Sequence, residues 1–595
     1  MKIHRSLFHH KLENKNAPMI CANFKYLRQR LFFLLFLFTC SLFAQQNKDS
    51  IDTEIINVVS SYKPSLAAAF KMKDVPEIDR KNSTKKKHFY SINNKRILSL
   101  FQPDPGAYQI PLKEKKLEAC PNYVKIGYGS YNTPLLEAFV TKKRKQHDFS
   151  FSLYNSASRG GIPEVLLDNN YTNTKLDFGY KNEQQNHTWI AKVNYQGDRY
   201  NWYGLPTDIN FENAVIETIE EQQAFRDFKL QGAFLLENRN LKRTDIKFHF
   251  FSDKFDSQET QVHLKTRFEF LLAKNRLLTD FGVDILNGSF ENNFSGNDAL
   301  NYGQLTFSAA ASYPISINGL HLKLGTQLVH NSDMEKNTEQ FYVYPDIQLD
   351  CLFNKNALRL YAGVNGGLTQ NSYQNFTTTN PYVSPTLNTR PTHEAFNAFL
   401  GVQGIIFSKS SYHIKSSLRQ ENNKFLFQLN PNLSNGTNAL AQGYQYGNSF
   451  NVVYDDIQTF QLFGELRSEL AEHLFVGANL SYQQYTTTLQ KSAWNLPSFH
   501  SKLFGSYAHE KWLYKAEILL VGNRKDLAVQ SDATEIHKDL KGFADVNVSA
   551  RYQLHPRWNA SFEIQNLFNQ NYVQFENFNV QGFQLFAGVR YQFHL

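Results

Sequence analysis

The main pattern in the chain, from residue 121 to its end, is alternation of apolar and polar side chains, interrupted by polar turns or loops. Successive side chains of a β-strand point to opposite faces, so each alternating segment predicts a strand with one apolar face. The last segment shows this most clearly. Its apolar face holds Phe583, Leu585, Ala587, Val589, Tyr591 and Phe593, while Gln584, Gly588, Arg590 and Gln592 occupy the other face with Phe586 as an exception.

The same alternation recurs throughout this region, for example in residues 149–153, 176–180, 189–195, 246–250, 460–469, 474–483 and 544–554. The predicted strands are about ten residues long, and Tyr and Phe gather near their ends as an aromatic girdle at a membrane interface would require. Candidate strands number between about 18 and 24, and about 22 suits the length. The sequence therefore predicts an all-β fold, a transmembrane antiparallel β-barrel over residues 121–595.

A soluble all-β protein, such as a propeller or a chain of sandwiches, would also alternate. Strands of about ten residues instead of five or six, and the lack of a blade-length repeat, favour the membrane barrel. Composition agrees, because aromatic residues make up 14% of the chain while the mean hydropathy is only -0.47. A helical membrane protein of this size would need repeated apolar runs of about 18 residues or more.

The one long apolar run, residues 31–44, follows a basic segment and ends in the small residue Ala44. This order is typical of a secretory signal peptide, so we expect residues 1–44 to be a leader cleaved after Ala44. We therefore expect secretion through the inner membrane and location in the outer membrane. A membrane-anchor helix and a lipoprotein modified at Cys40 are the alternatives, and the second is weakened because the apolar run continues beyond Cys40.

The formal net charge of +9 is concentrated before the predicted barrel. Residues 1–44 carry +6 and residues 45–120 carry +5, which leaves the barrel region near -2. A nucleic-acid footprint is therefore not indicated. Prolines interrupt residues 45–120, and we expect a periplasmic segment, or one that enters the barrel mouth. Cys120 and Cys351 remain after the leader is removed, and the sequence leaves open whether they pair.

Enzymatic signatures are missing from the sequence. It has no HExxH, paired CxxC, GxxxxGK[ST] or GxSxG motif, and its 18 histidines are scattered. We therefore expect no catalytic, cofactor or metal site. An outer-membrane hydrolase would bring serine and histidine together across neighbouring strands, which sequence spacing leaves open.

Residues 566–572 form a polar segment with aromatic anchors directly before the final strand, and by their residues alone they predict a tight turn. The segment resembles the NLFNxxY turn before the last strand of TonB-dependent outer-membrane receptors. Those chains usually end on an aromatic residue that the barrel-assembly machinery reads, whereas here Phe593 is followed by His594 and Leu595. The residues that carry the resemblance are Asn566, Leu567, Phe568, Asn569 and Tyr572.

A second segment, residues 52–59, resembles a TonB box, a short acidic and then β-branched stretch that pairs with TonB as an added strand. An extended segment with β propensity suits strand addition, although many short β-branched runs share this property. Residues 61–72 and 123–139 resemble a Bacteroidetes subgroup of such receptors. The box-like residues are Asp52, Thr53, Glu54, Ile55, Ile56, Asn57, Val58 and Val59.

The predicted barrel lacks the plug domain that fills the lumen in TonB-dependent receptors. Only residues 45–120 separate the leader from the first strand, and they lack the plug's glycine-rich strand pattern. The resemblance therefore covers residues 121–595 and the box-like stretch. It implies outer-membrane lipid around the wall, TonB as a partner, and a plug or lipoprotein partner that supplies the gate.

Three functions fit these predictions. The first is uptake of a nutrient across the outer membrane, and the second is passive diffusion through a porin-like channel. The third is a structural or adhesive surface protein that acts through long polar loops at residues 196–222, 369–393 and 431–449. These loops are rich in Asn, Gln, Tyr, Gly and Thr, which suits stacking contacts with ligands such as glycans but equally suits ordinary solvated loops. The substrate and the oligomeric state are not encoded in any motif.

Overall fold

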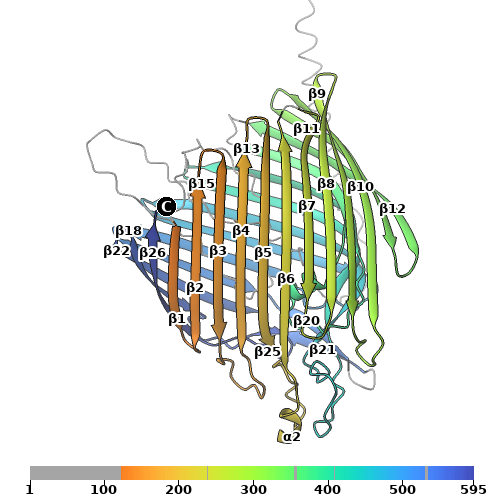
Figure 1. Cartoon of the computed structure of the whole chain (residues 1–595), viewed down its shortest axis with the longest axis vertical. Coiled ribbons are helices and arrows are strands. Elements are labelled where there is room, and N and C mark those ends of the chain that lie inside the picture. The colour runs from red at the N-terminus through yellow and green to blue at the C-terminus, as the bar shows by residue number, and fades with distance from the viewer. Residues whose placement is uncertain (1–121, 238, 354–357, 408, 530–533) are drawn as a thin grey trace, which may run out of the picture. The chain divides into compact units, whose positions relative to one another are not determined.

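The computed structural model of the chain describes residues 122–595, apart from residues 238, 354–357, 408 and 530–533. In this part of the chain, 22 antiparallel strands close into one barrel (Figure 1). The predicted fold class and the expected number of strands are confirmed. A propeller or a chain of sandwiches is thereby excluded.

The first half of the barrel wall runs in sequence order, each strand pairing with the next. Its strands are β1 (Asn122–Gly129), β2 (Thr133–Lys143), β3 (His147–Ser158), β4 (Tyr171–Glu183), β5 (His187–Asn201), β6 (Gln222–Leu236), β7 (Leu241–Ser252), β8 (Gln258–Leu272), β9 (Asn275–Phe290), β10 (Leu300–Ile317) and β11 (Leu320–Asp333).

The second half continues in the same way and contains two short hairpins outside the wall, β20–β21 and β24–β25. Its strands are β12 (Thr338–Phe353), β13 (Leu358–Thr369), β14 (Thr392–Ile406), β15 (Ser410–Leu429), β16 (Phe450–Ala471), β17 (Leu474–Thr487), β18 (Phe499–His509), β19 (Trp512–Val521), β20 (Arg524–Val529), β21 (Glu535–Leu540), β22 (Phe543–His555), β23 (Trp558–Gln565), β24 (Val573–Phe575), β25 (Phe578–Asn579) and β26 (Gln584–Phe593). The described helices are α2 (Asn213–Ile216) and α3 (Tyr373–Thr379).

The barrel closes where the last strand meets the first. β26 pairs with β1 in an antiparallel register that runs from Asn122 opposite Phe593 to Gly129 opposite Phe586. The wall therefore has no free edge, which removes the unpaired backbone groups that an open sheet would present inside a membrane.

The apolar face of the alternating pattern points outward. In β26, Leu585 and Val589 are 47% and 42% exposed, whereas Arg590, the residue after Val589, is only 5% exposed. Ile126 of β1 is also largely exposed on the outer face. Apolar side chains outside and polar ones inside are the reverse of a soluble protein and match a wall surrounded by lipid.

Phe586, the exception in the alternation of β26, faces the lumen and lies flat against glycines of β1. A Cβ atom added at Gly127 would come within 2.5 Å of the Phe586 ring, and one at Gly129 would overlap the same ring. The glycines thus make room for an inward-facing aromatic side chain at the closing seam.

The two ends of the barrel differ in their connections. Short turns, such as Asn318–Gly319 with φ angles of 47° and 82°, join strands at one end, which we call the short-turn end. Long connections gather at the other, the long-loop end, where α2, β20 and β21 lie at the bottom of Figure 1. Bacterial outer-membrane barrels show this asymmetry, with periplasmic turns and longer extracellular loops.

Several predictions fall on residues outside the described part of the chain. These are the signal peptide 1–44, the segment 45–120, the box-like residues 52–59 and Cys120. Cys351 lies in β12, where it stands opposite Leu320 and Leu360 of the neighbouring strands. None of the helices in the described ranges is long and apolar enough to cross a membrane.

Candidate functional site

Five long loops fold inward at the long-loop end and pack together, among the described residues, into one buried aromatic cluster, which we call the loop core. The loops are residues 159–170, 202–221, 370–391, 430–449 and 566–583, and side chains of six wall strands complete the cluster. Its buried members are Leu167, Trp202, Tyr203, Leu205, Phe211, Val215, Ile219, Phe225, Phe251, Leu286, Phe290, Tyr302, Tyr373, Phe376, Tyr382, Val383, Leu387, Phe425, Phe427, Leu429, Tyr444, Tyr446, Phe450, Val452, Phe575 and Phe578.

Three rings from three different loops meet in the loop core. Tyr382 stacks on Phe578 with ring centroids 3.7 Å apart, and Tyr203 meets Phe578 edge to face at 5.1 Å. The hydroxyl of Tyr203 donates to the carbonyl oxygen of Asn579 at 2.7 Å and lies 3.2 Å from the hydroxyl of Tyr382. Because loops far apart in sequence hold one another, the core binds them as a unit.

Two carboxylates, Asp253 in the turn after β7 and Glu259 on β8, fix the loop that carries α3. The hydroxyl of Tyr373 donates to Asp253 at 2.8 Å, and the backbone N–H of Tyr373 donates to Glu259 at 2.6 Å. Glu259 also accepts a hydrogen bond from the hydroxyl of Tyr302 at 2.6 Å. Burial raises the pKa of Asp253, although its hydrogen bond from Tyr373 works in the opposite direction. Satisfied buried polar groups of this kind specify one arrangement of the loop.

Loops 202–221 and 430–449 approach each other at their backbones. The N–H of Glu212 donates to the carbonyl oxygen of Gly436 at 2.9 Å, and the side chain of Asn448 donates to the carbonyl oxygen of Trp202 at 2.9 Å. A Cβ atom at Gly443 would overlap the carbonyl oxygen of Glu220. Glycine is therefore required there by the closeness of the two chains.

A second buried cluster secures the hairpin β20–β21 beside the loop core. Leu527 of β20 packs with a group from strands β15 to β17 and the following loop, namely Leu426, Ile457, Tyr485, Ala493, Trp494 and Leu496. The Arg524 guanidinium donates to the carbonyl oxygens of Val573 and Gln574 in the last long loop. Burial, with nearby Glu576 adding to it, raises the pKa of Asp526 to about 7.

The lumen wall nearer the short-turn end carries several charged pairs. Arg267 donates to both carboxylate oxygens of Asp280 at 2.7 and 2.8 Å, and Lys265 also contacts Asp280 at 3.1 Å. Across the wall, Lys502 and Glu517 are 2.7 Å apart. Cross-strand opposite charges of this kind stabilise the pairing of neighbouring strands.

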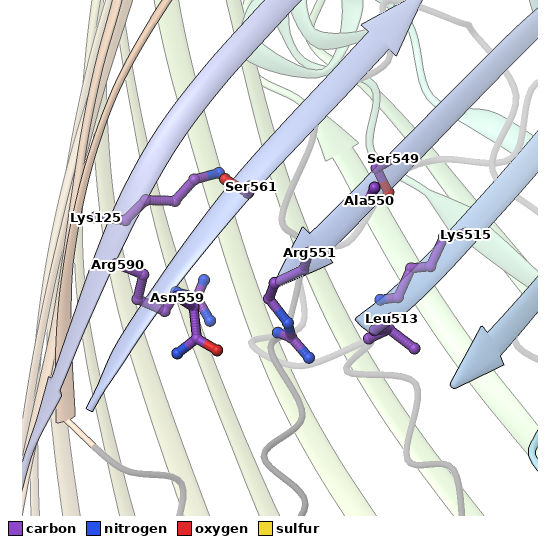
Figure 2. A pocket seen from close by; sticks show the side chains of 9 residues that line it. All are labelled: Lys125, Leu513, Lys515, Ser549, Ala550, Arg551, Asn559, Ser561 and Arg590. Carbon is purple, nitrogen blue, oxygen red and sulfur yellow. The ribbon is translucent and has the colours of Figure 1, made fainter. Parts of the chain in front are cut away.

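One part of this charged wall is rich in cations, and we call it the basic patch. It consists of Lys125, Lys515, Arg551 and Arg590, which stand on β1, β19, β22 and β26 (Figure 2). With Asn559, Ser549, Ser561, Leu513 and Ala550, they line a cavity of about 30 Å³.

The structure places the five residues of the predicted turn motif at the start of connection 566–583. Asn566 and Asn569 adopt left-handed conformations with φ near 47° and 51°, and the Asn566 side chain accepts from the N–H of Gln570 at 2.8 Å. Tyr572 stacks on Phe543 at 3.9 Å, whereas Phe568 is 68% exposed. Leu567 donates its N–H to Val546 at 2.9 Å. The turn is local, but the connection continues through β24 and β25 and is longer than a tight turn.

Other features of the site differ from the sequence expectations. The three long loops expected to be polar contribute buried aromatic side chains to the loop core. Aromatic residues near strand ends were expected to form a membrane girdle, but some of them, among them Phe225, Phe251 and Phe290, belong to the loop core. The sequence does contain a signal for this placement. Each of the three residues falls on the set of alternate positions in its strand that faces the lumen. The basic patch was missed, since its members are separated by up to 465 positions and no local pattern joins them.

Within the described ranges, no group of three or more His, Cys, Asp or Glu side chains is arranged to hold a metal ion. His249, one of the scattered histidines, instead lies 2.9 Å from Asp227 across the neighbouring strand.

The closed 22-stranded barrel is a fold shared with solved outer-membrane receptors. No protein-family model matches the chain, and no curated protein sequence does so either. Among solved structures, the FrpB iron transporter of Neisseria meningitidis (F5-1 variant) superposes with a TM-score of 0.59 at 11% identity, over 80% of this chain and 82% of FrpB. The ferric-catecholate import receptor Fiu of E. coli K12 gives 0.59 at 9% identity, over 80% and 82%. FpvA of P. aeruginosa gives 0.58 at 12% identity, over 80% and 71%.

These three neighbours are TonB-dependent receptors, and they are transporters or receptors and not enzymes. At such low identity the likeness establishes the fold and leaves the substrate undetermined. The arrangement itself has two parts with different chemistry, a cluster of packed aromatic loops at the long-loop end and charged pairs toward the short-turn end.

Proposed function

We propose that this chain is an outer-membrane barrel for nutrient uptake, in which the loop core closes the long-loop end until a ligand binds there. The observation that carries the proposal is the packing of five loops into one buried cluster that reaches wall strands on several sides of the barrel. A diffusion pore would keep its loops apart, because its function needs a continuous aqueous path. The fold shared with iron and siderophore receptors supports uptake as the task.

The proposal includes partners that the resemblance implies. Residues 52–59 would pair with TonB as an added strand and so transmit force to the barrel. A plug or lipoprotein partner would complete the gate toward the periplasm. Residues 1–44 would direct secretion through the inner membrane, the barrel-assembly machinery would insert the wall, and lipid would cover its outer face.

The loop core also bears on the two alternatives. A passive channel requires that the long-loop end conduct ions at rest, whereas the described loops pack there around buried rings such as Tyr382 and Phe578. An adhesive surface requires that the loops present their aromatic side chains outward, whereas Trp202, Tyr203 and Tyr444 are buried. Uptake with a closed resting state is the function that both observations favour.

Single-channel recording of the purified full chain in planar bilayers tests the closure. We expect no steady conductance from the native chain and large openings after deletion of residues 372–390, the segment that carries α3. A steady large conductance from the native chain would overturn the proposal. In cells, the same deletion should admit vancomycin, a molecule too large for an intact outer membrane. As a control, a deletion within a short exposed turn, away from the loop core, is not expected to admit it.

Removal of residues 52–59 tests the coupling to TonB. We expect a chain that still assembles in the outer membrane but no longer cross-links to TonB in cells. Unchanged cross-linking would exclude these residues as the contact while leaving the loop core as a closure.

A further inference from the structure

The basic patch joins a cation of the first strand to cations of β19, β22 and β26, and β1 lies beside these strands only because the barrel closes. Lys125 of β1 stands directly opposite Arg590 of β26, and Arg590 stands opposite Asn559 of β23. On the next pair of strands, Arg551 of β22 stands opposite Ser561 of β23. Lys515 of β19 stands opposite Ser549 of β22 and completes the patch. All four cations therefore lie on one continuous surface of the lumen wall (Figure 2).

We propose that the basic patch binds an anionic group, a carboxylate or a phosphate, of the solute that passes through this barrel. The inference rests on the proposed uptake function and names the charge class of the solute. The lumen face of the patch rules out a lipid headgroup as its occupant, since the lipid-facing residues of the same strands, such as Ile126 and Val589, point the other way.

Short polar side chains lie between the cations of the patch. Ser561 stands opposite Arg551, and Ser549 stands opposite Lys515. Both serines line the cavity of about 30 Å³ that the cations surround. A cavity of this size has room for a water-sized atom, so it admits an oxygen atom of an anionic group and leaves the rest of the solute in the lumen.

The charges around the patch do not balance. Lys125 is held by Glu563 at 3.0 Å and lies 3.9 Å from Glu137, and Glu137 is also 3.8 Å from Arg590. Glu517 interacts electrostatically with Lys515 and also lies 2.7 Å from Lys502. Three carboxylates, one of them shared with Lys502, thus stand near the four cations of the patch. An excess of positive charge around a small hollow favours an oxyanion.

The burial of the four cations divides them into a fixed pair and a reaching pair. The side chains of Lys125 and Arg590 are only 4% and 6% exposed, and the Arg590 guanidinium lies 3.9 Å from the centre of the Tyr123 ring. Lys515 and Arg551 are half-buried and project toward the lumen. Fixed charges reduce the ordering cost of binding, and the reaching pair provides the donors that a solute meets first.

The patch lies toward the short-turn end, since Lys125 is near the start of β1 and Arg590 near the end of β26. The loop core closes the opposite end. A solute that enters through the loops would therefore meet the patch on its way out of the barrel, which assigns the patch to the exit side of the route.

Isothermal titration of the purified full chain in detergent, at low ionic strength, tests the proposal with two probes, citrate and inorganic phosphate. We expect at least one probe to bind, and the double variant Lys515→Gln with Arg551→Gln to bind it about tenfold more weakly. A matched control replaces Arg243 and Arg267 by Gln, which removes the same lumenal charge from the opposite wall, and it should bind as the native chain does. Binding to citrate alone would specify a carboxylate, and to phosphate alone a phosphate.

Equal affinity in the native chain and the Lys515–Arg551 variant would overturn the proposal, as would an equal loss in the Arg243–Arg267 control or failure of both probes to bind the native chain. Heat-modified migration in gels identifies variants that keep a folded barrel, and only those are compared. The outcome is independent of the conductance test, because a closed loop core with no anion binding would reject the patch alone, whereas a conducting native chain would reject the uptake function.

Discussion

The long-loop half and the short-turn half of the lumen are built on the same strands. They differ in the side chains that those strands direct into the lumen. Toward the short-turn end the wall presents charged side chains in cross-strand pairs, such as Arg267 with Asp280. Toward the long-loop end it presents rings that pack against folded loops. The alternation that separates the lipid face from the lumen face is unchanged along the wall. The lumen face is therefore itself divided along the strand axis into a charged part and an apolar part.

Strand β15 contains both halves of this comparison. His413, Arg419 and Glu421 line its charged part, a register irregularity follows Glu421, and Phe425 and Phe427 then join the loop core. In β9 the same change occurs between Asp284 and Leu286 without an irregularity. The change from charged to apolar side chains therefore marks where each strand begins to contact the loops. Apolar burial holds the loops, while ion pairs in a wet lumen contribute little to stability.

The sharpest way to break the comparison is to remove a ring from the loop core. Phe578→Ala should destabilise the loop packing by about 4 kcal/mol, because a fully buried ring is lost and its neighbours Tyr382 and Tyr203 face a cavity. Hydrogen exchange of residues 370–391 and 566–583 measures the loss. Phe568→Ala is the matched control in the same loop, since Phe568 is 68% exposed, and it should leave exchange unchanged.

A smaller effect is expected where two loop backbones touch. Gly443→Ala places a methyl group against the carbonyl oxygen of Glu220 and should cost about 2 kcal/mol of loop stability. Limited proteolysis between residues 430 and 449 reports the opening. Gly464→Ala in β16 is the control, because a Cβ there meets open space. Equal protease resistance in both variants would show that the loops are held without this contact.

The hairpin β20–β21 should respond to pH. The pKa of buried Asp526, usually 3.8, is raised to about 7, so the folded hairpin favours the neutral acid. Its stabilising contribution is complete below pH 3.8 and is lost as the pH rises through 7. Hydrogen exchange of residues 524–529 should therefore increase by about thirtyfold between pH 5.5 and pH 8 after correction for intrinsic rates. Asp526→Asn should remove this dependence, and a persisting dependence would assign it to another group.

The smallest effect should come from the charged half. Arg267→Gln breaks the contacts with Asp280, yet the Arg267 side chain is 47% exposed and Lys265 also neutralises that carboxylate. We expect less than about 1 kcal/mol of lost stability in urea unfolding. A loss as large as that of Phe578→Ala would reverse the contrast between the two halves.

The sequence predicts the wall well because its physical rule is local. Alternation from Phe583 to Phe593 assigns the two faces of β26, and the same rule repeated along the chain leads to a barrel of about 22 strands. Phe586 broke that rule. Its explanation lies in Gly127 and Gly129, more than 450 positions earlier, which become neighbours only when the barrel closes.

The candidate site depends on contacts between residues far apart in the sequence. It could therefore not be predicted from the sequence. Tyr203, Tyr382 and Phe578 come from three loops, and no spacing between them is fixed by strand geometry. The loops read as polar because most of their residues are polar, and only their rings are buried. The four cations of the basic patch occupy ordinary lumen positions of their own strands, so only the order of strands around the wall brings them together.

The ring of Phe586 over Gly127 and Gly129 has a consequence for the dimensions of the whole molecule. A slip of one residue between β1 and β26 would exchange the lipid and lumen faces, but a slip of two would preserve them. Hydrophobic pattern alone cannot reject the second error, whereas a bulky ring that fits only opposite glycines can. The stagger at this seam contributes to the shear of the barrel, and shear with strand number sets strand tilt and diameter. One aromatic side chain at the seam thus helps determine how wide the barrel is.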